Sequence, residues 1–144
     1  MKHKVLAYIV RQNGGHAQLL VFEHRDFPEA GLQVPAGTVE RGELPEGALY
    51  REIREEAGLE PQQLHLLRKL GEYPGEASAE AQTWHVYWLI AAGPLPDQWQ
   101  HVVGGAGEDR DLVFEYAWAD LAPGLQLAGI QGQWLPAIIE KYAS

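Results

Sequence analysis

The stretch from residue 45 to residue 57 constrains this chain more than any other part of the sequence. It has no proline after its first position, and apolar residues recur at a spacing of three to four from Leu44 to Ile53. This is the period of an amphipathic helix, and a glycine at position 58 is typical of the residue that ends one. The sequence therefore predicts a helix over residues 45–57 with Gly58 as its C-cap.

One edge of the predicted helix is crowded with acids. Glu55 and Glu56 follow Glu52 by three and four residues, so the three carboxylates project from neighbouring points of one face. Like charges at this spacing repel by about 0.2–0.5 kcal/mol per pair, and a divalent cation among the oxygens would turn repulsion into attraction. Without cysteine or histidine neighbours, the set favours Mg²⁺ or Mn²⁺ over zinc. The alternative is a solvated helix face whose acids pair with Arg51 and Arg54.

The residues around the helix fall into a fixed pattern that weighs against the alternative. The pattern consists of Gly37, Glu43, Arg51, Glu52, Ile53, Glu55, Glu56, Gly58 and Leu59. These residues match every fixed position of the Nudix box, so the chain resembles the Nudix hydrolases. Members of that family mostly hydrolyse a diphosphate linked to another moiety X, usually within a nucleotide derivative.

The resemblance implies a role for each acid of the box. Glu52, Glu55 and Glu56 would be the metal-binding and base-supplying carboxylates, and the carbonyl of Gly37 would be an additional ligand. The implied cofactor is Mg²⁺, with Mn²⁺ as the alternative. Family members differ over which glutamate deprotonates the attacking water, and some recruit a base from outside the box. Glu52 is our hypothesis for the base.

Three further residues of the box have structural or supporting roles by the same resemblance. Arg51 and Glu43 would form an ion pair that braces the loop against the helix. We assign Arg51, together with Glu52, to the catalytic residues. Gly58 would end the helix. Outside the box, many family members have an acid just before the strand that corresponds to residues 112–118 here, and this acid completes the metal site or acts as the base. Glu108 is the best-placed candidate for that acid, and its rivals are Asp109, Asp111 and Glu115.

Two other residues are candidates for substrate binding. Arg25 follows the second predicted strand and could reach a substrate phosphate, although a lone surface arginine is more often only solvated. His85 lies in the aromatic-rich segment 83–92, where one ring could stack on a base. The alternative for each aromatic residue there is packing in the core.

The order of predicted elements gives the fold class. Two apolar runs joined by an Asn-Gly-Gly turn predict an opening hairpin. Strands are expected at residues 5–10, 18–22, 32–35, 64–70, 83–92 and 112–118, loops at 71–82 and 93–107, and a second helix at 131–142. This order predicts the α/β class, with a mixed β-sheet packed between helices as an α/β/α sandwich, which the resemblance also implies.

Composition excludes several classes of protein. The absence of cysteine excludes disulfides, thiolate metal sites and cysteine nucleophiles. The formal charge of −9 argues against extended nucleic-acid binding, because nucleic acid is held largely by Lys and Arg contacts to phosphate. A small nucleotide substrate stays compatible with this charge, since a bound metal would supply positive charge locally.

Length and hydropathy predict one domain over residues 1–144. No apolar run approaches the length that spans a membrane, and the N-terminus runs into a strand-like segment without a cleavage site. We therefore expect a cytoplasmic protein that does not act at a membrane. Its five tryptophans leave room for an apolar interface, so a homodimer is an open alternative to a monomer.

Two functional hypotheses from different classes follow. The first is a metal-dependent hydrolase that cleaves a nucleoside diphosphate linked to X by water attack on phosphorus. The second is a Nudix-fold binding or regulatory module without turnover, which a degenerate box would favour; this box is intact. A third, an acidic protein that stores divalent ions, predicts metal binding without nucleotide preference. The identity of X lies in loops that the sequence alone does not interpret.

Overall fold

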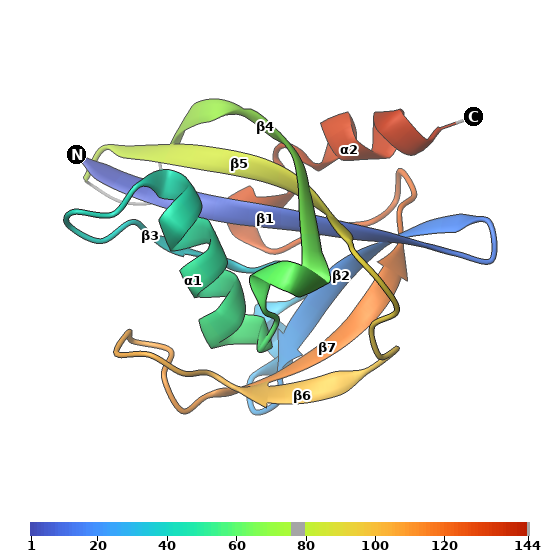
Figure 1. The fold of residues 1–144 in the computed structure, drawn as a ribbon, viewed down its shortest axis with the longest axis horizontal. Helices are drawn as coiled ribbons and strands as arrows, with labels where there is room; N and C mark the ends of the chain where they lie inside the picture. Colours follow the sequence, from blue (N-terminus) through green and yellow to red (C-terminus); the bar gives the residue numbers. More distant parts are fainter. Residues whose placement is uncertain (76–79, 144) are drawn as a thin grey trace.

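The computed structural model describes residues 1–75 and 80–143, and it has the α/β architecture that the sequence predicts (Figure 1). Two α-helices, seven strands and three short 3-10 helices make up the regular structure of these residues. The helices are α1 (Pro45–Ala57) and α2 (Leu135–Tyr142). The strands are β1 (Lys2–Asn13), β2 (His16–His24), β3 (Ala36–Thr38), β4 (Leu64–Gly75), β5 (Gln82–Ala91), β6 (Trp99–Val102) and β7 (Val113–Asp120).

The strands form one mixed sheet in the order β4-β5-β1-β2-β7-β6. Strands β1 and β5 run parallel, and the other neighbours are antiparallel. Strand β1 pairs with β2 only from Val10 to Asn13, and nearer its start it pairs with β3 from Lys4 to Leu6. Strand β2 leaves β1 beyond that turn and continues along β7. The sheet therefore splays open beside the first half of β1, and β3 enters the opening.

Strand β1 is the centre of the fold because its residues from Val5 to Val10 are buried on both faces. Val5, Ala7 and Ile9 pack in the cluster that includes Ala48, Leu49 and Ile53 of α1. The alternate residues Leu6, Tyr8 and Val10 pack in the cluster that includes Leu135 and Ile138 of α2. Since alternate residues of a strand point to opposite faces, the two helices cover opposite sides of the sheet. The predicted α/β/α sandwich is confirmed.

Helix α1 has the bounds that its apolar period predicts, and it ends at Gly58 with the left-handed φ of 74°. Donors from the segment around β6 satisfy its last carbonyl oxygens, which have no partner within the helix. Trp99 Nε1 donates to Ala57 O at 3.0 Å, and His101 Nε2 and the Gly104 amide lie 3.0 and 2.9 Å from Glu55 O. The end of α1 is therefore fixed by residues more than forty positions away in the sequence.

The structure corrects four of the predicted elements. The strand expected at 32–35 is a single bridge between Phe22 and Gln33, and the pairing with β1 begins at Ala36 instead. Strand β4 continues through two register shifts to Gly75, inside the loop expected at 71–82; residues 76–79 of that loop lie outside the described residues. The loop expected at 93–107 contains β6, and α2 starts at Leu135 rather than at 131.

Among the residues that the structure describes, neither helix has the length and apolar character needed to cross a lipid bilayer.

Gly58→Ala should destabilise the protein more than Gly42→Ala does. Both glycines have a left-handed φ, so each alanine should lower the free energy of unfolding by about 1–2 kcal/mol. A Cβ at position 42 would meet no atom within 4 Å, whereas one at position 58 would lie 2.8 Å from His101 Nδ1. Displacing His101 from Glu55 O should cost about 1 kcal/mol more. Urea denaturation of the two variants measures the difference, and equal losses would contradict it.

Candidate functional site

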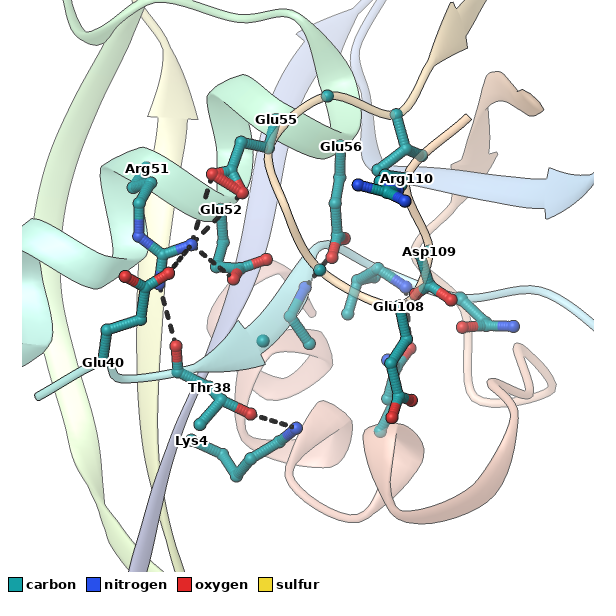
Figure 2. Close-up of a pocket in the computed structure, with 18 of the residues that line it drawn as sticks. Lys4, Thr38, Glu40, Arg51, Glu52, Glu55, Glu56, Glu108, Asp109 and Arg110 are labelled. Atoms are coloured by element: carbon teal, nitrogen blue, oxygen red, sulfur yellow. Dashed lines mark hydrogen bonds and ion pairs between the residues drawn. The ribbon is translucent and has the colours of Figure 1, made fainter. Parts of the chain in front are cut away.

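A cavity of about 500 Å³ opens where β3 enters the splayed sheet (Figure 2). Its walls come from the first half of β1, β3, one face of α1, the start of β5 and the loop between β6 and β7. Charged side chains dominate the lining: Lys2, Lys4, Glu40, Arg51, Glu52, Glu55, Glu56, Glu108, Asp109 and Arg110. The structure thus brings the three acids of the predicted helix edge into one concave site.

Arg51 links the loop, the strand and the helix that surround the cavity. Its Nε and Nη2 donate to the Glu43 carboxylate at 2.7 and 2.9 Å, and Nη2 also donates to Thr38 O at 2.9 Å. Its Nη1 donates to Glu52 at 2.8 Å and to Glu55 at 3.2 Å. The ion pair that braces the loop against the helix is therefore present. The planar guanidinium suits this role because its five donors point in fixed directions.

Glu56, which is buried, and Glu52, which is partly buried, form a carboxyl pair. Burial raises the pKa of the Glu56 carboxyl well above its ordinary value, and the charge of Glu52 adds to the rise. Burial also raises the pKa of Glu52, while hydrogen bonds with Glu56 and Arg51 oppose that rise. The Ala36 amide donates to Glu56 Oε1 at 3.2 Å. A buried and a partly buried carboxyl in contact favour either a shared proton or a bound cation.

Two glycines leave room that the carboxylates need. A Cβ on Gly37 would overlap the Glu52 carboxylate, and a Cβ on Gly105 would overlap that of Glu55. Gly37 therefore lets the backbone of β3 approach Glu52 closely. Carboxylate oxygens beside an accessible backbone are the donors that a hard divalent cation prefers, so the residues present fit Mg²⁺ or Mn²⁺.

The acids do not form a ready ion cage. Among residues 1–75 and 80–143, no group of three or more His, Cys, Asp or Glu side chains is arranged to hold a metal ion. Glu52 and Glu55 instead share Nη1 of Arg51 (Figure 2). A cation coordinated by both acids would require their side chains to turn from this nitrogen.

The loop between β6 and β7 supplies two further acids. Glu108 and Asp109 both line the cavity, and the charge of Asp109 acts on both Glu56 and Lys4. The other rivals lie elsewhere: Asp111 is exposed with a φ of 71°, and Glu115 accepts from Gln100 at 2.8 Å on β6. Glu108 and Asp109 thus remain the two candidates from this loop.

The two predicted substrate-binding residues do not line this cavity. Arg25 is half-exposed and pairs with its neighbour Asp26 at 3.2 Å. His85 is buried on the α1 side of the sheet, where its Nε2 lies 2.9 Å from His3 Nδ1 and its Nδ1 lies 2.8 Å from Lys69 Nζ. A substrate contact by Arg25 or His85 stays a prediction.

Sequence reasoning missed Lys4 and Trp84 as residues of the cavity. Trp84 was expected only as one of several aromatic residues of the segment 83–92, and Lys4 lies just before the strand expected at residues 5–10. One signal in the sequence could have found Lys4: it shares the alternation of Leu6, Tyr8 and Val10, so it places a cation at the end of an apolar run on one face. The parallel register then sets Lys4 beside Trp84.

The sequence of this chain is similar to a known domain family and to known enzymes. Residues 1–136 match the model of the NUDIX domain. The chain is 33% identical over 87 residues to the 8-oxo-dGTP diphosphatase of Escherichia coli (strain K12), a match that covers 54% of this chain and 64% of that protein. It is 30% identical over 125 residues to the RNA pyrophosphohydrolase of Roseobacter denitrificans, covering 85% and 71% of the two chains. This chain therefore spans less than two thirds of the E. coli relative.

Solved structures agree with the fold. The C. elegans Ap4A hydrolase, in a binary complex, superposes with a TM-score of 0.72 at 19% identity, covering 98% of this chain and 97% of that one. At this identity the likeness concerns the fold alone.

Glu43→Gln should destabilise the protein at neutral pH, whereas Glu40→Gln should not. Both carboxylates face Arg51, but Glu43 is 23% exposed and bonded through two nitrogens, while Glu40 is 65% exposed at 3.4 Å. We expect a loss of about 1 kcal/mol for Glu43→Gln and less than about 0.5 kcal/mol for Glu40→Gln.

The hydrogen bonds from Arg51 hold the pKa of Glu43 below its ordinary value. The stability that Glu43 contributes is therefore present above its unfolded pKa and is lost as the pH falls through the lowered folded pKa. Urea denaturation of both variants across acid pH measures this. A Glu43→Gln deficit that persists unchanged in strong acid would contradict it.

Glu56→Gln should stabilise the protein in chelator at pH 8. Because the pKa of Glu56 is raised on folding, the folded protein holds the Glu56 proton more tightly than the unfolded chain does. Above the raised pKa the carboxylate is both charged and buried, which lowers the free energy of unfolding. The gain should be about 1 kcal/mol at pH 8 and should fade as the pH falls and wild type takes up the proton. Thermal unfolding measures it. The exposed Glu140→Gln is the control for the change in net charge, and a gain of equal size there would contradict the assignment.

Proposed function

The chain belongs to the Nudix family, and on that premise we propose that it is a metal-dependent hydrolase. Its reaction would cleave a phosphoanhydride bond in a nucleoside diphosphate linked to another moiety X, by attack of water on phosphorus. One observation carries the proposal: Glu52, Glu55 and Glu56 of α1 face a single cavity together with Gly37 and the acids of the β6–β7 loop. The names of the relatives, a diphosphatase and a pyrophosphohydrolase, support the same reaction class.

We assign the metal to Glu52, Glu55, Glu56, the Gly37 carbonyl and Glu108, with Asp109 as the alternative to Glu108. When bound, a divalent cation would neutralise phosphate charge and orient the attacking water. Mg²⁺ is the proposed ion, and Mn²⁺ is the substitute that the same oxygen donors would accept.

The chain's own groups would hold the water and take its proton. Glu52 is the proposed base, since its carboxylate lies against the backbone of Gly37 and accepts a hydrogen bond from Arg51 Nη1 at 2.8 Å. Arg51 donates to Glu43, Thr38 O, Glu52 and Glu55, so we propose that it is a positioning residue. Glu43 would hold Arg51 in turn through its two hydrogen bonds.

We further propose that the substrate is a small nucleotide, and that residues 1–144 act as one domain in the cytoplasm. The charge of −9 disfavours long nucleic acid, and the absence of cysteine fits a reducing compartment. A homodimer is a further proposal that sedimentation would test.

The test of this function is phosphate release, after coupled phosphatase treatment, from a panel of nucleotides. The panel would hold nucleoside triphosphates, sugar nucleotides, dinucleoside polyphosphates, dinucleotide cofactors and capped RNA ends, each with Mg²⁺, Mn²⁺ or chelator. Metal-dependent turnover of one class would support the hydrolase and identify X. Nucleotide binding by a folded, metal-loaded protein without any turnover would favour a regulatory module instead.

Glu52→Gln should lower kcat by about 10²- to 10⁴-fold, because the variant keeps the shape of the side chain and loses the base. The control is Glu46→Gln, which removes an exposed charge from the first turn of the same helix and should leave turnover unchanged. Thermal unfolding would verify that both variants fold. Near-normal activity in Glu52→Gln would move the base to Glu55, Glu56 or a loop acid.

A further inference from the structure

Lys4 and Arg51 are two cations of the same cavity with different partners. The Arg51 guanidinium contacts four carboxylates, whereas Lys4 Nζ, within the described part of the chain, has no ion pair. Its hydrogen bond goes to Thr38 Oγ1 at 3.1 Å, a neutral acceptor. Burial, followed by the charge of Lys2, lowers the pKa of the Lys4 ammonium group. The charges of Glu52, Glu56 and Asp109 oppose this shift. The cavity therefore holds a half-buried cation that feels the charges of Glu52, Glu56 and Asp109 but forms no ion pair with a described residue.

The sheet fixes where this cation lies. Lys4 is the register partner of Thr38 on β3 and of Trp84 on β5, so their side chains flank it on one face. Nζ lies 5.5 Å from the centre of the Trp84 ring, which itself packs against Trp134. Figure 2 shows the hydrogen bond between Lys4 and Thr38, with the acids of α1 on another side of the cavity. The aromatic wall limits where the lysine can move.

The acids of α1 and Lys4 of β1 line the same cavity from different walls. Glu52, Glu55 and Glu56 form the part that takes cations, and a metal-bound diphosphate would lie against it. Lys4, with Lys2 nearby on the same strand, forms the part that takes anions. A substrate that spans both parts needs negative charge beyond its metal-bound diphosphate.

We propose that Lys4 binds a third phosphate group of the substrate, and that X is therefore itself a phosphate or a phosphate chain. This inference rests on the proposed hydrolase and names its substrate class: nucleotides with three or more phosphates, in preference to nucleoside diphosphate sugars. Lys4 is the specificity residue in this assignment. Its single ammonium would contact the phosphate oxygens as a point charge, and Thr38 would hold the ammonium in place.

The test compares kcat/KM for a nucleoside triphosphate and for a nucleoside diphosphate sugar in wild type, Lys4→Met and Lys4→Arg. Wild type should prefer the triphosphate. Lys4→Met keeps the apolar stem and loses the charge, so kcat/KM for the triphosphate should fall about 10- to 100-fold, mainly through KM. The diphosphate sugar should change less than about 3-fold, and Lys4→Arg should recover part of the loss. Lys141→Met, an exposed lysine of α2, is the charge control.

Binding of a non-hydrolysable triphosphate analogue, measured by calorimetry, separates this inference from the proposed function. If wild type turns over no member of the nucleotide panel but binds the analogue in a Lys4-dependent way, the hydrolase fails and the Lys4 assignment stands. If wild type is active and Lys4→Met loses nothing, or loses equally on both substrates, the Lys4 assignment is overturned and the hydrolase stands. Lys4→Gln repeats both measurements should the methionine variant fail to fold.

Discussion

The position of the cavity depends on the charge of Arg51. One guanidinium contacts the loop through Glu43, strand β3 through Thr38 O, and helix α1 through Glu52 and Glu55. A lysine could not replace it, because a single ammonium cannot present fixed donors to acceptors on three sides. Since β3 carries Gly37 to the Glu52 carboxylate, the floor of the cavity is set by the same contacts. The geometry of the site follows from one planar cation.

That cation leaves the site short of positive charge. Arg51 faces Glu40, Glu43, Glu52 and Glu55 at once, and Glu56 lies buried behind them. An acid cluster of this kind lowers stability unless a proton or a metal ion joins it. The same carboxyls that weaken the metal-free fold would therefore gain most from a bound cation, which is the usual relation between stability and function at an active site.

The sequence predicts the elements whose signals are local, and it misses those that depend on distant pairing. Helix α1 and its end at Gly58 follow from an apolar period and one glycine, and the acids of the site follow from their spacing on that helix. Strand β6 was taken for loop because its four residues lie between prolines and glycines, and its pairing is with β7. The alternation of β1 indicates the face on which Lys4 lies, but its neighbours in the cavity wall depend on the distant pairings of β1 with β3 and β5.

That register also bears on the order in which the protein folds. Strand β1 opens the chain, yet its parallel partner β5 follows some eighty residues later, and the loop with Glu108 comes later still. Contacts so far apart in sequence form slowly, since a long loop must close before they contribute. A nascent chain that has already made α1 therefore holds its acids in water, without Lys4 and Trp84 opposite them. We expect substrate affinity to arise only after the central strands have paired.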